Sequence, residues 1–127
     1  MIRHFHSVRK AKGMVKYISI FRLKPGYDPQ ESYQIWMNEH VPYIKKMMSP
    51  ELTGYVVGKV VHDMTKGEKF FGSVQLSFQS LDDAKKAWNR VLDDAPDELY
   101  KRITDIRRVI IEEIDVFSSN PDYNSDD

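Results

Sequence analysis

The residue best suited to chemistry in this chain is His40, which lies in the segment Trp36-Met37-Asn38-Glu39-His40-Val41-Pro42. An imidazole titrates near neutral pH, so His40 can serve as a general acid or a general base. Apolar residues recur at helical spacing on both sides of it, and His40 lies on their stripe. Two interpretations stay open: a catalytic group facing a cavity, or a core histidine bonded to a backbone carbonyl freed by Pro42.

Other side chains could complete a small-molecule site around His40. Trp36 and Tyr43 are candidates for the walls of a pocket, because aromatic rings line many ligand sites. Polar residues of two predicted strands could donate hydrogen bonds to a ligand carbonyl, namely Tyr17, Ser19, Ser73 and Gln75. The competing interpretation places the aromatic rings in the core and the polar strand residues against water.

The composition excludes several kinds of site. The chain has no cysteine, which removes disulfides, thiolate nucleophiles and cysteine-based metal sites. It contains no nucleophile elbow, phosphate-binding loop or dinucleotide fingerprint. His4 and His6 alone are a weak metal signal, and a solvated flexible terminus explains them better. We therefore expect neither a metal nor a cofactor.

The balance of charge and hydropathy limits the partners. Acidic and basic residues number 19 each, which argues against a nucleic-acid surface. No apolar run approaches the roughly 18 residues of a membrane span, and the N-terminus lacks the apolar region of a signal peptide. The chain has 127 residues, of which 41% are hydrophobic and 30% charged, so we expect one soluble cytoplasmic domain.

The helix that carries His40 has clear start signals. Asp28 is a good N-cap, and Pro29 occupies the first helical position, where its missing N–H costs nothing. Glu31 follows Asp28 by three residues, which is the spacing of a capping box. The apolar spacing then predicts helix over residues 28–48.

Pro42 interrupts this helical pattern. Its ring clashes with the carbonyl of Asn38 in an α-helix, and it disfavours helical angles at Val41. We therefore expect a kink or break, which would place His40 near a helix C-terminus on the core side.

The remaining segments predict a complete fold. Apolar runs and alternation indicate strands at residues 15–24, 52–62, 70–78 and about 106–117. A second helix begins at Ser80, and a short one over residues 97–103 precedes the last strand. The order βαββαβ is typical of a ferredoxin-like α+β fold, a four-stranded antiparallel sheet with both helices on one face. Residues 14–117 would form this domain, between a flexible basic extension (1–13) and a disordered acidic tail (118–127).

Several predicted strands are apolar on both faces. In the first strand, Ile18 and Ile20 point to one face of the sheet, and Tyr17 and Phe21 point to the other. Two helices can cover only one face of a sheet. A second copy of the same chain is the simplest cover for the other face, so we expect a homodimer.

The chain resembles the EthD-like family of the dimeric α+β barrel superfamily. The matching features are a first strand ending in Lys24-Pro25-Gly26, the segment Trp36-x-x-x-His40-x-Pro42, and Phe78-x-Ser80-x-Asp82 entering the second helix. The resemblance covers roughly residues 14–117. It implies two ferredoxin-like sheets that close a barrel across a dimer, with a cavity between sheet and helices in each subunit. The chain is more distantly similar to muconolactone isomerases and small polyketide cyclases, which act without metals on compact ring-forming or aromatic substrates.

Three functional hypotheses follow. The leading one is a cofactor-independent enzyme of isomerase, lyase or cyclase type that acts on a small ring-containing carbonyl compound. His40 would move a proton, and the polar strand residues would hold the developing oxyanion. The first alternative is a cofactor-free monooxygenase of the same superfamily. The second is a dimer without catalytic activity that binds a small molecule or is purely structural.

Overall fold

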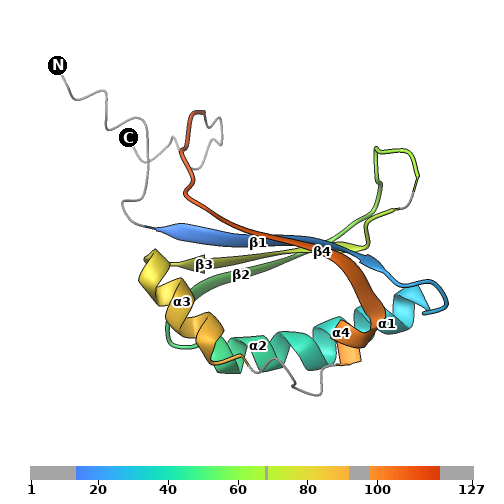
Figure 1. Ribbon diagram of the computed structural model, residues 1–127, viewed down its shortest axis with the longest axis horizontal. Coiled ribbons are helices and arrows are strands. Elements are labelled where there is room, and N and C mark those ends of the chain that lie inside the picture. Colours follow the sequence, from blue (N-terminus) through green and yellow to red (C-terminus); the bar gives the residue numbers. More distant parts are fainter. Residues whose placement is uncertain (1–13, 68, 92–97, 118–127) are drawn as a thin grey trace, which may run out of the picture.

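The computed structural model describes residues 14–67, 69–91 and 98–117, which form an antiparallel sheet with helices on one side (Figure 1). The strands are β1 (Val15–Leu23), β2 (Leu52–Lys59), β3 (Gly72–Phe78) and β4 (Ile103–Ile111). They lie in the order β2-β3-β1-β4, and every neighbouring pair is antiparallel. The predicted ferredoxin-like α+β fold is confirmed.

The helices are α1 (Pro29–Ile35), a π-helical turn η2 (Trp36–His40), α2 (Val41–Met48), α3 (Leu81–Asn89) and α4 (Glu98–Arg102). All of those labelled in Figure 1 lie on the same face of the sheet. The predicted caps are present: the Asp28 carboxylate accepts a hydrogen bond from the Glu31 N–H at 2.7 Å, and the Ser80 hydroxyl accepts one from the Asp83 N–H at 3.1 Å.

The prediction of a break at Pro42 is wrong. The chain stays helical past this residue, and Val41 has helical angles, φ −57° and ψ −49°. The Val41 N–H donates to the carbonyl of Trp36, five residues back, as in a π-helical turn. The wider turn η2 precedes the proline directly, so the helix accommodates the missing donor by widening and does not end.

Several strand boundaries also differ from the prediction. β4 begins at Ile103, which pairs with Leu23, so this residue belongs to the strand and not to the short helix before it. β4 ends at Ile111 and β2 ends at Lys59, which leaves Ile114 and Val116 outside the sheet. The predictions for residues 1–13 and 118–127 lie outside the described residues.

Burial separates the two faces of the sheet. The face toward the helices is buried along β1 at Tyr17, Ser19 and Phe21, and along β3 at every second residue from Gly72 to Phe78. The opposite face leaves apolar side chains in solvent, including Val56 at 58% and Val109 at 54% exposure. Within the described ranges, no helix is long and apolar enough to cross a membrane.

Candidate functional site

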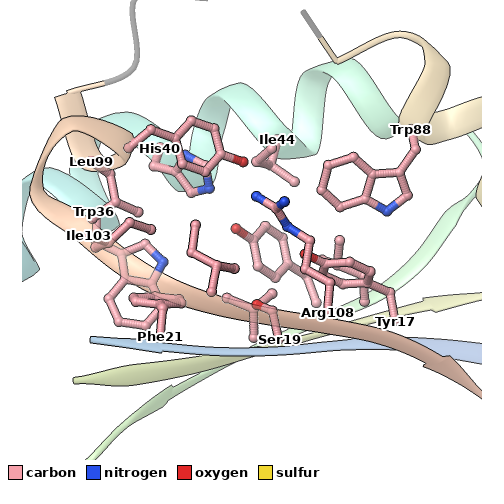
Figure 2. Close-up of a pocket in the computed structure, with 15 residues that line it drawn as sticks. Tyr17, Ser19, Phe21, Trp36, His40, Ile44, Trp88, Leu99, Ile103 and Arg108 are labelled. Atoms are coloured by element: carbon pink, nitrogen blue, oxygen red, sulfur yellow. The ribbon is translucent and has the colours of Figure 1, made fainter. Parts of the chain in front are cut away.

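A small cavity lies between the inner face of the sheet and the helices (Figure 2). Its volume is about 30 Å³, which is room for about one water molecule. Both layers and the short helix α4 contribute to its lining: Tyr17, Ser19, Phe21, Trp36, His40, Ile44, Tyr55, Val74, Leu76, Trp88, Leu99, Tyr100, Ile103, Ile106 and Arg108.

The helical layer supplies Trp36, His40 and Ile44, which belong to a series of buried residues at every fourth position from Ser32 to Met48. In a regular α-helix a four-residue step overshoots one turn by about 40°, so the series would drift by about 160°. The π-helical turn η2 holds more residues per turn and takes back part of this drift. The widened turn therefore keeps the whole series, including His40, on the side of the sheet.

His40 itself is only 7% exposed. Its ring packs edge-on against that of Tyr100 in α4, with centroids 5.1 Å apart and planes at 75°. Tyr100 also lines the cavity, so the imidazole contacts α4 and borders the cavity. The catalytic role of His40 stays a prediction.

The strand layer supplies Tyr17 and Ser19 from β1, and both are buried, at 7% and 4% exposure. Figure 2 shows their hydroxyl-bearing side chains on the same side of β1, below His40. Tyr17 also packs against Trp88 of α3, with ring centroids 4.8 Å apart. Two hydroxyl groups and one imidazole therefore border the same cavity.

Trp36 is fully buried and forms one end of the cavity. Its ring is surrounded by other aromatic rings, with centroids of Phe21 at 5.1 Å, Phe71 at 5.9 Å and Tyr33 at 6.0 Å. Its indole N–H has no hydrogen-bond partner among the described residues. A buried donor without a partner is costly, and a ligand atom in the cavity could satisfy it.

Three predicted binding residues lie elsewhere. Tyr43 belongs to α2 but is absent from the lining of the cavity. Ser73 and Gln75 alternate along β3 with the buried residues, so their side chains are on the sheet face away from the helices. The prediction that Ser73 and Gln75 bind a molecule in this cavity is therefore wrong, because both side chains lie on the opposite face of the sheet. Alternation puts Val74, Leu76 and Phe78 on the core side, but the sequence alone left open whether the polar face opposite lines a pocket or meets solvent.

Arg108 lines the cavity but was not among the predicted site residues. It pairs directly with Ser19 across β1 and β4, and directly opposite residues point to the same side of a sheet. Figure 2 shows its guanidinium pointing toward the middle of the lining residues. The residue is exposed overall, which places it at the mouth of the cavity and not in its depth.

A one-residue bulge in β4 sets this orientation. Arg22 pairs with Thr104, whereas Ile20 pairs with Arg107, so β4 contains one extra residue in this interval. Asp105 in this interval has a positive φ of 52°, and its carboxylate binds the Arg22 guanidinium at 2.6 Å. Regular alternation from Ile103 would have put Arg107, and not Arg108, opposite Ser19.

A larger groove adjoins the cavity on the side of α3 and β4. Its volume is about 630 Å³, and it shares Tyr17, Trp88, Tyr100, Ile106 and Arg108 with the inner cavity. The rest of its lining is mainly apolar: Ala84, Lys85, Val91, Val109 and Ile110. The groove is large enough for a ring compound, which the inner cavity is not.

Ion pairs away from the cavity fix the elements that carry it. The Arg102 guanidinium binds the carboxylates of Glu31 at 2.9 Å and Glu98 at 3.4 Å, and thus ties α4 to α1. These bonds, that to Glu31 first, raise the pKa of Arg102. Arg90 donates to the carbonyl of Met47 at 2.8 Å and pairs with Glu51, whose pKa it lowers. In the part of the chain that the structure describes, no three histidine or acidic side chains gather to hold a metal ion.

Comparison with known proteins identifies the fold. No protein-family model and no curated protein matches the chain. An EthD family protein from Bacillus halodurans is similar in structure, with 24% identity, a TM-score of 0.58, and coverage of 79% of this chain and 98% of that one. This chain has the EthD-like fold. The resemblance predicted from the sequence is therefore confirmed at the level of the fold.

Two enzymes share this EthD-like fold with the chain. A hydroxynitrile lyase from Passiflora edulis is 16% identical, with a TM-score of 0.59 over 83% of this chain and 97% of that one. SnoaB, a cofactor-independent oxygenase from Streptomyces nogalater, is 10% identical, with a TM-score of 0.56 over 80% and 93%. The fold thus occurs in proteins with different small-molecule chemistry.

Proposed function

We propose that this protein is a cofactor-independent enzyme that transfers a proton on a small ring-containing carbonyl compound. The observation that carries the proposal is the meeting of the His40 imidazole with the hydroxyl groups of Tyr17 and Ser19 around one cavity. A base and two hydrogen-bond donors are the groups that such chemistry requires. The lyase and the oxygenase of the same fold support chemistry of this general kind.

The proposed reaction uses only the side chains of this chain. The carbonyl end of the ligand enters the inner cavity, and its ring occupies the adjoining groove, because only the groove has sufficient volume. His40 takes a proton from the carbon beside the carbonyl, and the electron pair moves onto the carbonyl oxygen. The hydroxyls of Ser19 and Tyr17 donate hydrogen bonds to that oxygen. Return of the proton at a different carbon gives an isomerase, and loss of a leaving group gives a lyase.

Exchange of ligand hydrogen for solvent deuterium tests this proton transfer without knowledge of the natural substrate. A panel of cyclic ketones and butenolides is incubated in deuterium oxide, and exchange beside the carbonyl is followed by nuclear magnetic resonance. We expect the wild-type protein to accelerate exchange for at least one compound, and His40→Asn to lower that acceleration by about 100-fold or more. His62→Asn is the matched control, because His62 is exposed and lies outside the cavity.

The outcomes separate the hypotheses. A folded His40→Asn variant with wild-type exchange would refute the role of His40, and no exchange with any compound would refute the proposed chemistry. If compounds raise the melting temperature of both wild type and His40→Asn equally and neither protein exchanges hydrogen, the protein is a binding module.

A cofactor-free monooxygenase is the second candidate. The specific observation in its favour is the buried indole N–H of Trp36, which borders the cavity and has no partner among the described residues. It could hold an oxygen atom of an activated aromatic compound beside His40. Oxygen consumption with quinol compounds separates this activity from proton transfer alone.

We further propose that two copies of the chain associate through the sheet face away from the helices. That face carries Ile18 and Ile20 on β1 and the exposed residues Val56 and Val109 on the edge strands. A second copy covers such a face symmetrically and leaves no new apolar surface.

Sedimentation at micromolar concentration tests this association. We expect a dimer for the wild type, and a monomeric or unfolded chain for Ile18→Glu, which places a charge in the middle of the face. Val61→Glu is the control, because Val61 is 90% exposed and lies outside the strands. A well-folded wild-type monomer would exclude the dimer.

A further inference from the structure

Arg108 differs from most other arginines in the described part of the chain. Arg22, Arg90 and Arg102 each form an ion pair with a carboxylate. Arg108 forms none with any described residue, although its guanidinium points toward the cavity. A guanidinium beside an enclosed space, with its five donors uncommitted to an internal acid, is suited to bind an oxyanion from outside.

The charge of the lining supports this role. Among the described residues that border the inner cavity and the groove there is no aspartate or glutamate. The charged residues of the combined lining are Arg108 and, at the groove, Lys85. Among these described lining residues a negatively charged ligand meets only positive charge, and a cationic ligand finds no counter-ion.

The position of Arg108 also fixes where the anionic group lies. The residue borders both the inner cavity and the larger groove, so it stands at the boundary between them. Trp88, Val91 and Ile106 form an apolar surface on the groove side. A ring can pack on this surface while an acidic group on the same molecule reaches Arg108.

We infer that Arg108 makes the site specific for a ring-bearing carboxylate, with the carboxylate on the guanidinium and the ring in the groove. The inference deepens the proposed function, since it names the substrate class of the same site, but it concerns binding alone. The guanidinium offers two parallel N–H donors to the two carboxylate oxygens, and a neutral amide of the same shape lacks that match.

Binding of 1-naphthoate and 1-naphthamide provides the test, measured by isothermal titration calorimetry on the full chain. We expect naphthoate to bind the wild type at least about 10-fold more tightly than naphthamide. Arg108→Gln should weaken naphthoate on the order of 10- to 100-fold and change naphthamide by less than about threefold. Higher salt should weaken naphthoate more than naphthamide.

Arg107→Gln is the matched control, since it removes the same charge from the neighbouring position on the other face of β4. It should leave both affinities within about twofold. Equal binding of the two probes, equal losses in the two arginine variants, or binding of neither probe at millimolar concentration would overturn the inference. The result is independent of the exchange assay: naphthoate selectivity without His40-dependent exchange leaves the inference standing and removes the proposed catalysis.

Discussion

Replacing Gly72 with alanine should destabilise the protein through a collision with Trp36. A Cβ atom at this position would lie 2.3 Å from two carbons of the indole ring, Cη2 and Cζ3, and 3.3 Å from the carbonyl oxygen of Gly58. Carbon atoms pack at about 3.5–4.0 Å, so the overlap exceeds about 1 Å. Trp36 is fully buried between other aromatic rings and has little room to move.

The expected loss of unfolding free energy is about 3 kcal/mol, at the upper end of the range for overpacked cores. Gly54→Ala is the matched control on the same sheet, because its nearest neighbours are the Oγ and Cβ atoms of Ser77 at 3.2 and 3.3 Å. The Ser77 hydroxyl can rotate away, so the control should cost less than about 1 kcal/mol. Trp36→Phe removes the colliding atoms, and the double variant should recover at least about 1 kcal/mol relative to the sum of the single variants.

Urea unfolding followed by circular dichroism measures these differences at one fixed protein concentration, since the stability of a dimer depends on concentration. Equal costs for Gly72→Ala and Gly54→Ala would refute the proposed collision. Strict additivity of Gly72→Ala and Trp36→Phe would show that the loss arises elsewhere.

Two further predictions concern the turn after β2 and the wide helical turn. The Asp63 carboxylate accepts hydrogen bonds from the Phe70 N–H and from Thr65, which lower its pKa from 3.8 to about 2. Because the pKa of Asp63 is lower in the folded than in the unfolded state, these bonds stabilise the fold above about pH 4, and their contribution is lost as the pH falls through about 2. The midpoint of urea unfolding should therefore fall more steeply between about pH 4 and 2 for wild type than for Asp63→Asn. Pro42→Ala restores a backbone donor opposite the Asn38 carbonyl, so α-helical hydrogen bonding should replace the π turn, raise local helix stability and re-aim His40. Deuterium exchange in the panel should then fall, and unchanged exchange in a well-folded variant would show that the turn has no role in catalysis.

The fold was predictable where the determining signals are local. Asp28 and Ser80 cap their helices through residues three positions later, and the same short spacing is visible in the sequence. The order of strands and helices along the chain also followed from the hydrophobic pattern, and that order indicated the ferredoxin-like fold. A break at Pro42 was predicted incorrectly because the rule for proline assumes α-helical geometry, whereas the chain uses a π turn.

The site was predictable only in part. Tyr17 and Ser19 line the cavity as strand alternation predicts, and Trp36 and His40 lie on the predicted apolar stripe, which the π-helical turn keeps on the side of the sheet. Alternation predicts that Val74, Leu76 and Phe78 of β3 face the core, but it does not decide whether the polar face opposite lines a pocket or meets solvent. Arg108 was missed because two adjacent arginines on a strand are usually solvated, and the bulge at Asp105, which decides that Arg108 and not Arg107 faces Ser19, lies before the predicted start of the strand.

The segment of β4 after the bulge at Asp105 repeats each residue type at two adjacent positions, so two registers of the strand would place the same types of side chain at the cavity mouth. β4 reads Arg107-Arg108-Val109-Ile110-Ile111, so each polarity class is repeated at adjacent positions. If the bulge were absorbed by a one-residue slip, Arg107 would face Ser19 in place of Arg108, and Val109 would face Tyr17 in place of Ile110. The hydrophobic pattern therefore does not select between the two registers, and the Arg22–Asp105 ion pair at the bulge helps to do so. Either register would still present a guanidinium to the mouth of the cavity and an aliphatic side chain beside it.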